Sequence, residues 1–235
     1  MNLSIVYEDK DFFVINKPSG IAVHKTHPKD PNKTLVDFIL EKYPEIKNVG
    51  DDPKIRPGIV HRLDKETSGL MTIAKTQSAF EYLKKQFQER KIKKTYLALV
   101  QGQLKNKTGT IDLPLGKIGT KQTTRMKGKK ELKEREAITE YKIIREFADY
   151  SLLEVYPKTG RTHQIRIHLN AIGHPVVCDS LYGGRKKICP PELGRLFLHA
   201  QKLEFTSPSG QHLFLEVDPP KELTNFLDSI IISKS

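Results

Sequence analysis

The decapeptide at residues 61–70 holds the side chains of this chain that are best suited to chemistry. It reads His-Arg-Leu-Asp-Lys-Glu-Thr-Ser-Gly-Leu, which places an acid, bases of different type, two hydroxyls and a glycine in one short stretch. An ionised and well-aimed carboxylate such as Asp64 suffices as a nucleophile, because covalent catalysis splits a difficult displacement into easier steps. A structural interpretation competes with this one, since a loop aspartate often caps a turn and Arg-x-Asp is often a local ion pair.

Short apolar runs on both sides indicate that the decapeptide is a loop between core elements. A turn-like Arg-Pro-Gly and two apolar residues precede it, and residues 70–74 follow with the Thr and Ile content of a buried strand. Loops held between rigid strands commonly carry catalytic groups. Nearer the N-terminus, β-prone runs at 5–7 and 12–15 predict a hairpin that ends in the turn Lys17-Pro18-Ser19-Gly20.

The elements that must position this loop are short helices and strands in alternation. Helices are predicted at residues 34–43 with Thr34 as N-cap, at 78–90, after residue 162 and at the C-terminus after Pro219-Pro220. Strands are predicted at 95–100, as an antiparallel pair at 137–144 and 152–156, and as two closing strands at 196–205 and 212–217. We read residues 44–57 as a polar loop.

Two of these predicted elements carry further candidate site residues, Tyr96 and Arg166. In the run at 95–100, Tyr96 shares a face with two apolar residues, and a tyrosine in that setting is most often core filling. In the helix after residue 162, Arg166 falls together with His163 and Asn170 on a polar side, and the other side is expected to be buried.

Several segments in the same order resemble motifs of the RluA-type RNA pseudouridine synthases. They are the decapeptide itself, Lys-Pro-x-Gly followed by His24, Lys-Thr-Tyr-Leu-Ala around Tyr96, Arg-Thr-His-Gln-Ile-Arg ending at Arg166, and Leu-Phe-Leu-His-Ala ending at Ala200. This resemblance implies that Asp64 is the catalytic aspartate and that Arg166 pairs with it. It also implies that Tyr96 lies against the target base, that Arg62 fills the space left by a flipped base, and that the Lys17 turn braces the active-site loop.

Composition agrees with a polyanionic partner. Forty Lys and Arg against 28 Asp and Glu give a net charge of +12 and a pI near 9.5, which favours binding to nucleic acid. Positive charge gathers at residues 84–94 and at 121–135, where seven Lys or Arg and two Glu leave a local charge of +5. The second segment is open to two interpretations, a solvated surface or a set of phosphate contacts.

The cysteine content and the N-terminal sequence indicate the cellular compartment in which the protein is expected. Cys178 and Cys189 stand without a Cys-x-x-Cys pair or a His/Cys cluster, so neither a disulfide framework nor a zinc site is indicated. His163 and His168 are poorly spaced to share a metal on one helix face. No signal peptide or run of about 20 apolar residues is present, so we expect a cytoplasmic protein without membrane contact.

We therefore predict a single α+β catalytic domain over residues 1–235, with a mixed and mostly antiparallel sheet that an active-site cleft bisects. The predicted function is isomerisation of uridine to pseudouridine in structured rRNA or tRNA, with Asp64 as nucleophile and Arg62, Tyr96 and Arg166 as substrate-binding residues. No cofactor or metal is expected, RNA is the expected partner, no protein partner is implied and a monomer is expected.

Two other functions compete with this prediction. A non-catalytic RNA-binding protein would also be basic, but it has no reason to place Asp64 among Arg62, Tyr96 and Arg166. A nucleoside or glycoside hydrolase would use paired carboxylates. Asp64 and Glu66 lie together in one loop, and no second candidate carboxylate is identified at the spacing that hydrolysis needs.

Overall fold

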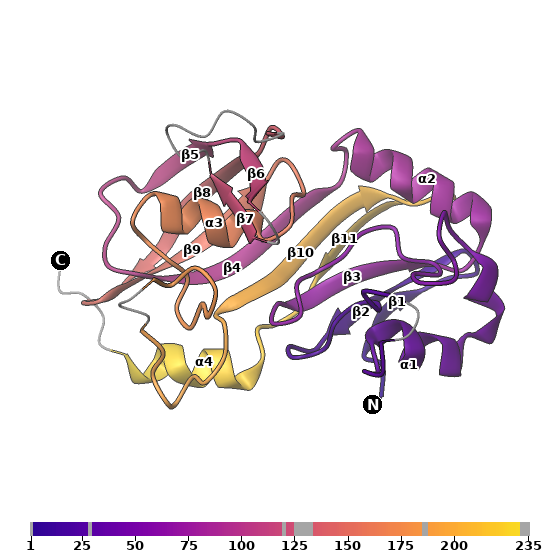
Figure 1. Ribbon diagram of the computed structural model, residues 1–235, viewed down its shortest axis with the longest axis horizontal. Helices are drawn as coiled ribbons and strands as arrows, with labels where there is room; N and C mark the ends of the chain where they lie inside the picture. The colour runs from indigo at the N-terminus through magenta and orange to yellow at the C-terminus, as the bar shows by residue number, and fades with distance from the viewer. Residues whose placement is uncertain (1, 28–29, 119–120, 125–133, 185–187, 231–235) are drawn as a thin grey trace. The chain divides into compact units, whose positions relative to one another are not determined.

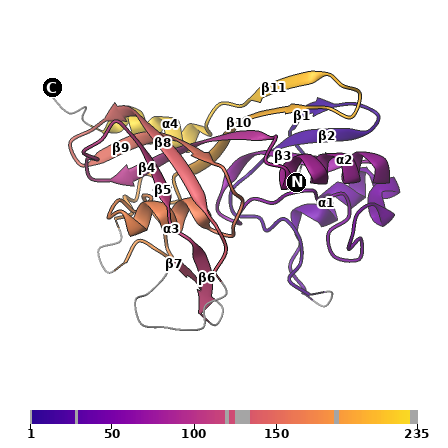
Figure 2. The ribbon, with the colours of Figure 1, turned by 90° about the horizontal axis from the view of Figure 1, so that it is seen from above.

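The computed structural model describes residues 2–27, 30–118, 121–124, 134–184 and 188–230 (Figures 1 and 2). The chain divides into two compact units, of which the first comprises Met1–Lys94 and Ala200–Asp218 and the second Thr95–His199 and Pro219–Ser235. In the described part of the chain, no helix is long and apolar enough to cross a membrane.

The first unit is built on an antiparallel sheet. Its elements are β1 (Ile5–Glu8), β2 (Phe12–Lys17), α1 (Leu35–Lys42), the 3-10 helix η1 (Pro44–Asn48), β3 (Ser68–Ala74), α2 (Gln77–Gln88), most of β10 (Leu198–Thr206) and β11 (His212–Glu216). The strands lie in the order β1-β2-β3-β10, with β11 beside β10. Every residue of β3 is buried, in agreement with its mostly apolar sequence.

An N-terminal cap and a buried face fix α2 in the first unit. Thr76 accepts a hydrogen bond from the backbone nitrogen of Ala79 at 3.2 Å and so caps the start of α2. Leu83 of α2 packs into a core cluster with Phe12, Val14 and other apolar residues from β3, β10 and β11. Helix formation over α2 therefore depends on one apolar stripe, and its lysines stay on the other side.

The second unit is a sheet covered by a helix on each face. Its elements are β4 (Lys93–Gln101), β5 (Thr108–Asp112), the hairpin β6 (Leu115–Ile118) and β7 (Lys121–Thr124), β8 (Ile138–Glu146), β9 (Tyr150–Pro157), α3 (Gln164–Ala171) and α4 (Lys221–Ser229). Four strands run in the order β4-β9-β8-β5, and each pair for which a register is known is antiparallel.

Alternation along β4 explains why both faces of this second sheet are apolar. Ala98 and Val100 pack against residues of α3, whereas Leu97 and Leu99 pack with residues of α4. Successive strand residues point to opposite faces, so alternate residues of one buried run pack against two different helices. Figure 2 shows α4 and α3 on opposite sides of β4 and β9. Tyr96 lies at the margin of the cluster on the α3 side.

Gly69, at the start of β3, occupies a position that only glycine can fill. Its φ is +117°, and a Cβ built there would overlap the backbone of Ala200, lying 2.6 Å from its nitrogen. Both features exclude an L side chain, because φ in this range is strained and the neighbour is rigid main chain. The glycine thereby allows β10 to approach the point where the decapeptide enters β3.

Most elements predicted from the sequence are confirmed, including the N-terminal hairpin, the strand after the decapeptide and the paired strands β8 and β9. The α+β class with a mostly antiparallel sheet is also confirmed. Residues 44–57 are not wholly a loop, because η1 forms there with Ile46 fully buried. The basic segment at 121–135 falls largely outside the described residues, which omit 125–133.

The expectation of no disulfide is wrong. Cys178 and Cys189 are bonded, with their Cα atoms 4.3 Å apart. The Cys178 nitrogen also donates to the carbonyl of Ile188, the residue before Cys189, at 3.0 Å. Two cysteines eleven residues apart give no spacing signal for a bridge, because only the path of the intervening loop decides whether they meet.

Candidate active site

The loop that carries Asp64 is tied to the turn after β2 by a buried lysine. Lys17 is fully buried, and its Nζ donates to the carbonyl oxygens of Pro18 at 2.8 Å, Ile21 at 3.0 Å and Lys65 at 3.2 Å. Hydrogen bonds from an ammonium group are about twice as strong as neutral ones. Lys17 therefore holds its own turn and the decapeptide loop with one charged group.

Two further hydrogen bonds join the same turn to the same loop. The Gly20 nitrogen donates to the carbonyl of Lys65 at 2.8 Å, and the Ser19 hydroxyl donates to the carbonyl of Glu66 at 2.6 Å. In the sheet, Lys17 lies opposite Gly69. The prediction that the Lys-Pro-x-Gly turn braces this loop is confirmed.

Asp64 itself sits between two fixed points. Leu63 is 6% exposed and anchors the loop in the core, and the Thr67 nitrogen donates to the backbone carbonyl of Asp64 at 3.2 Å. This hydrogen bond to the backbone carbonyl of Asp64 closes the turn. The Asp64 side chain is half-buried.

Arg62 is exposed and lies against a histidine from the neighbouring segment. Its Nη1 is 3.5 Å from Nε2 of His24, whose Nδ1 is 2.8 Å from the carbonyl of Lys25. When Nδ1 donates to that carbonyl, Nε2 carries the lone pair that accepts from Arg62. The contact is long and therefore weak, so Arg62 can leave His24 at little cost.

The start of α1 holds the segment that carries His24. The first backbone nitrogens of α1, from Leu35 and Val36, donate to the carbonyls of Ala22 at 2.8 Å and Val23 at 3.0 Å. These N–H groups have no partner inside the helix, so they are available to capture a neighbouring strand of backbone. The position of His24 thus follows from where α1 begins.

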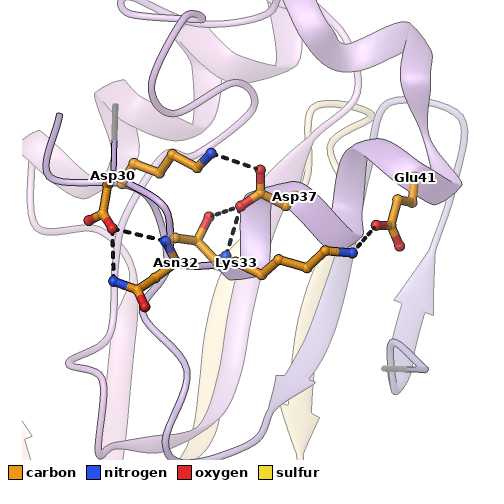
Figure 3. Close-up of polar contacts among 7 residues, drawn as sticks. Asp30, Asn32, Lys33, Asp37 and Glu41 are labelled. Atoms are coloured by element: carbon orange, nitrogen blue, oxygen red, sulfur yellow. Dashed lines mark hydrogen bonds and ion pairs between the residues drawn. The ribbon is translucent and has the colours of Figure 1, made fainter. Parts of the chain in front are cut away.

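Asp37 fixes the start of α1 (Figure 3). It accepts hydrogen bonds from the Thr34 nitrogen at 2.7 Å and the Thr34 hydroxyl at 2.9 Å, and it pairs with Lys25 at 3.6 Å. Burial by itself would raise the pKa of the Asp37 carboxyl, but the Thr34 hydrogen bonds and the Lys25 charge hold that pKa below its usual value. The predicted helix start at Thr34 is confirmed.

His61 is a structural residue of the loop and not a base. Its ring stacks on Phe87 of α2 with centroids 4.3 Å apart, and its Nε2 accepts a hydrogen bond from the Thr72 nitrogen at 2.9 Å. Burial, followed by the nearby charge of Lys94, lowers the pKa of His61 to about 3. The imidazole is therefore neutral near pH 7. Its Nε2 accepts the hydrogen bond from Thr72 of β3, and this contact fixes the beginning of the decapeptide.

In the second unit, Arg166 is buried in α3 and forms a forked ion pair. Its Nε donates to Oδ2 of Asp179 and its Nη2 donates to Oδ1, both at 2.8 Å. The exposed fractions of the two side chains are 1% and 0%. The predicted polar side of this helix is therefore not a solvated face, because Asp179 compensates the charge that helical spacing placed there.

Asp179 was not singled out from the sequence. It follows the apolar pair Val176-Val177, and a carboxylate next to buried residues indicates a buried partner. That partner could not be named from spacing, since Arg166 lies thirteen residues earlier on another element. The pairing of Asp64 with Arg166 remains a prediction, because the two residues belong to different units.

The lysines around the end of α2 are engaged by carboxylates. Ion pairs of this region join Lys84 to Asp51 at 2.7 Å, Lys91 to Glu89 at 2.7 Å and Lys93 to Glu204 at 2.8 Å. Lys94 lies in the same region, and burial lowers its pKa to about 8. Exposed pairs are worth only about 0–1 kcal/mol, so phosphates can compete with these carboxylates for the paired lysines.

Comparison with known proteins places these features in a family. Residues 11–171 match the model of the RNA pseudouridylate synthase family. An uncharacterized RNA pseudouridine synthase of Aquifex aeolicus is 41% identical over 230 residues, which cover 93% of this chain and 70% of that protein. The ribosomal large subunit pseudouridine synthase D of Borreliella burgdorferi is 37% identical, over 97% of this chain and 68% of that protein.

A solved structure shows the same fold. Human RNA pseudouridylate synthase domain containing 4 superposes with a TM-score of 0.76 at 25% identity, covering 96% of this chain and 92% of that one. The chain belongs to the RluA-type RNA pseudouridine synthases, isomerases that convert uridine in RNA to pseudouridine.

The Lys17 contacts generate a prediction. Lys17→Met removes the donor of three buried carbonyls, so we expect the free energy of unfolding to fall by about 1–3 kcal/mol. Because the loop backbone loses its charged anchor and is fixed less firmly, turnover on RNA should fall by about tenfold to a hundredfold in protein that remains folded. Chemical denaturation and single-turnover kinetics measure the two effects.

Lys65→Met is the matched control, since this lysine lies in the same loop and its side chain is exposed. Its unfolding free energy should stay within about 0.5 kcal/mol of wild type, with turnover unchanged. Equal turnover in wild type and folded Lys17→Met would show that Lys17 does not hold the catalytic loop.

Proposed function

We propose that this enzyme isomerises one or more specific uridines in structured ribosomal or transfer RNA, with Asp64 as the nucleophile. The observation that carries the proposal is the fixing of the Asp64 backbone by Leu63, Thr67 and the Lys17 turn, with the carboxylate half-buried. Ribosomal RNA is the first substrate to test, because relatives such as that of Borreliella burgdorferi are named ribosomal large subunit pseudouridine synthases.

The reaction needs no net redox change and no group donor. The bond from ribose C1′ to N1 of uracil breaks, the uracil turns, and C1′ joins C5. The hydrogen on C5 leaves as a proton and N1 gains one, so atoms balance within the RNA and water. As a nucleophile, Asp64 would attack either the sugar at C1′ or the base. A third route would use Asp64 as a base, which takes the proton from ribose C2′ as the C1′–N1 bond breaks to form a glycal, and returns that proton when C1′ joins C5.

Arg166 supports the charge and orientation of Asp64 in this proposal. A guanidinium presents a planar fork that a carboxylate accepts in one orientation, which a point charge on lysine does not reproduce. Tyr96 and Arg62 act on the base. A stacked uridine must leave the helix at a cost of a few kcal/mol, with Tyr96 stacking on the everted uracil and Arg62 filling the gap.

The substitution Asp64→Asn separates an enzyme from an RNA-binding protein. Asparagine is nearly isosteric but is a far poorer nucleophile and carries no charge to pair with Arg166. RNA labelled with tritium at uracil C5 reports the reaction, because joining C5 to C1′ releases the label to water. We expect wild type to release tritium with no added cofactor and in the presence of a chelator. Asp64→Asn should bind the same RNA within about threefold and release no label above background.

Two results would contradict the proposal at different points. Ordinary turnover by Asp64→Asn would mean that Asp64 is not the nucleophile. Binding of total cellular RNA that lacks the modification, without any tritium release by wild type, would support the competing function of a basic RNA-binding protein.

Arg62→Ala tests the role in base flipping. If Arg62 only stabilises the flipped state, its loss should slow the reaction on a stem-loop by about tenfold, the equivalent of about 1.4 kcal/mol. The effect on an unstructured RNA with the same target sequence should be less than about threefold, since there is little stacking to replace. Single-turnover rates on the two RNAs provide the measurement, and equal losses would rule out the wedge role.

A further inference from the structure

A pocket in the first unit, here called the α1 pocket, lies between the start of α1 and the segment that leads into the decapeptide. It encloses about 130 Å³ and is lined by Lys25, Thr34, Val36, Asp37, Leu40, Pro53, Lys54, Ile55 and Pro57. All of these residues belong to the same compact unit as Asp64. None of them has a role in the proposed reaction, so that reaction leaves the pocket unexplained.

The walls of the α1 pocket suit one flat apolar ring. Val36 and Leu40 lie one turn apart on α1 and therefore share a face of that helix. Pro53, Ile55 and Pro57 add apolar surface from the second segment. An engineered protein cavity of about 150 Å³ binds benzene. The volume of the α1 pocket thus corresponds to a single six-membered ring, and the fused rings of a purine exceed it.

A hydrogen-bond acceptor and a donor lie side by side in this pocket (Figure 3). Oδ2 of Asp37 accepts from the nitrogen and the hydroxyl of Thr34, at 2.7 and 2.9 Å, whereas Oδ1 is 3.6 Å from Nζ of Lys25. The second distance is longer than a hydrogen bond. The side chains of Lys25 and Asp37 are 32% and 29% exposed. Oδ1 can therefore accept from a ligand, and the Lys25 ammonium can donate to it.

This acceptor and donor match the hydrogen-bonding edge of a pyrimidine. Cytosine presents its N4 amino group as a donor next to the N3 acceptor, and uracil presents N3–H next to the O4 acceptor. In both bases the donor would meet Asp37 and the acceptor would meet Lys25. Unpaired bases of RNA are commonly recognised on this edge.

Lys54 adds a cation for the phosphate of the same nucleotide. Its side chain is exposed and lines the pocket. Within the part of the chain that the structure describes, no hydrogen bond or ion pair engages this ammonium group, whereas Lys25 is paired with Asp37. A lysine that neutralises a phosphate releases a counterion and contributes to RNA affinity.

Two connections along the chain place the α1 pocket next to the decapeptide. Lys25 directly follows His24, whose Nε2 is 3.5 Å from Nη1 of Arg62. Pro57 lies four residues before His61. Consecutive Cα atoms are only about 3.8 Å apart, so the nucleotides next to the target uridine are the ones that can reach the pocket.

We propose that the α1 pocket binds an unpaired pyrimidine of the substrate RNA that flanks the target uridine, with Lys54 on its phosphate. The inference rests on the proposed function and extends it to the choice of substrate. A base held in the α1 pocket sets which uridine of a loop reaches Asp64, because both sites belong to one unit and bind one RNA strand.

Leu40→Phe tests the proposal by filling the pocket with a ring. The cap formed by Thr34 and Asp37 is left unchanged. On a stem-loop around a uridine identified by pseudouridine mapping, we expect the affinity of Leu40→Phe to be about tenfold lower than that of wild type, the loss expected when one base is no longer stacked. The single-turnover rate of tritium release at saturating RNA should stay within about twofold of wild type, because the reacting groups are not touched.

Lys54→Met tests the phosphate contact. It should lower the magnitude of the slope of log K against log salt by about 0.7, the value for one phosphate of a single strand. Lys47→Met is the matched control, since Lys47 is an exposed lysine of η1 outside the pocket lining. Its affinity should stay within about twofold of wild type, because exposed charges outside the site are screened by salt.

Abasic RNA identifies the base that the pocket holds. Each unpaired pyrimidine that flanks the target uridine is replaced in turn by an abasic nucleotide, which removes the ring and keeps the phosphate. At one position wild type should lose about tenfold in affinity, and Leu40→Phe should lose no more than about twofold further, because both changes remove one contact. A purine at that position should weaken binding by wild type as the abasic nucleotide does, and exchange of cytosine and uracil should change it less than about threefold.

The outcomes separate this inference from the proposed function. If wild type releases no tritium from cellular RNA, the proposed function fails and the inference falls with it. If wild type turns over while folded Leu40→Phe binds the stem-loop as tightly as wild type does, or if its loss multiplies with that of every abasic position, only the inference is overturned. Thermal melting establishes folding. Should Leu40→Phe not fold, Ile55→Phe fills the same pocket from its other wall and is judged by the same results.

Discussion

The ammonium group of Lys17 is fully buried, and its hydrogen bonds to the carbonyls of Pro18, Ile21 and Lys65 join two segments that lie far apart in the sequence. Burying a charged group is costly unless donors and acceptors are matched. The position of the catalytic loop is therefore linked to the formation of β2 and of the turn that follows it. Without these acceptors Lys17 could not stay inside, and without Lys17 the loop would lose its main polar anchor.

Polar anchors of this kind suit a catalytic loop. Asp64 is the proposed nucleophile and would have to remain accessible to RNA, and the backbone around it is fixed by hydrogen bonds within the loop and from Lys17. Arg166 shows the same solution in the second unit, where a forked ion pair replaces apolar contacts around its guanidinium. Lys17 and Asp179, the charged groups that hold the Asp64 loop and Arg166, are both fully buried, and in the proposed reaction this would leave little freedom for reorganisation.

The sequence predicted what depends on local pattern. Apolar alternation in β4, the start of α1 at Thr34 and the turn at Lys17 follow from residue type and spacing, and the motifs and their order in the sequence indicate the family. It could not predict partners that tertiary folding brings together. Helical spacing placed Arg166 on a polar side, but its burial depends on Asp179 from a loop thirteen residues later. The disulfide between Cys178 and Cys189, and the carboxylates that engage the α2 lysines, were missed for the same reason.

The central claim is that this chain forms pseudouridine in RNA and that Asp64 is required for it. The most direct test is to map pseudouridines in total RNA from cells that lack the protein and from the same cells expressing wild type or Asp64→Asn at equal levels. We expect at least one pseudouridine in ribosomal or transfer RNA to disappear without the protein, to return with wild type and to stay absent with Asp64→Asn. An unchanged map in the cells that lack the protein, or full restoration by Asp64→Asn, would contradict the account.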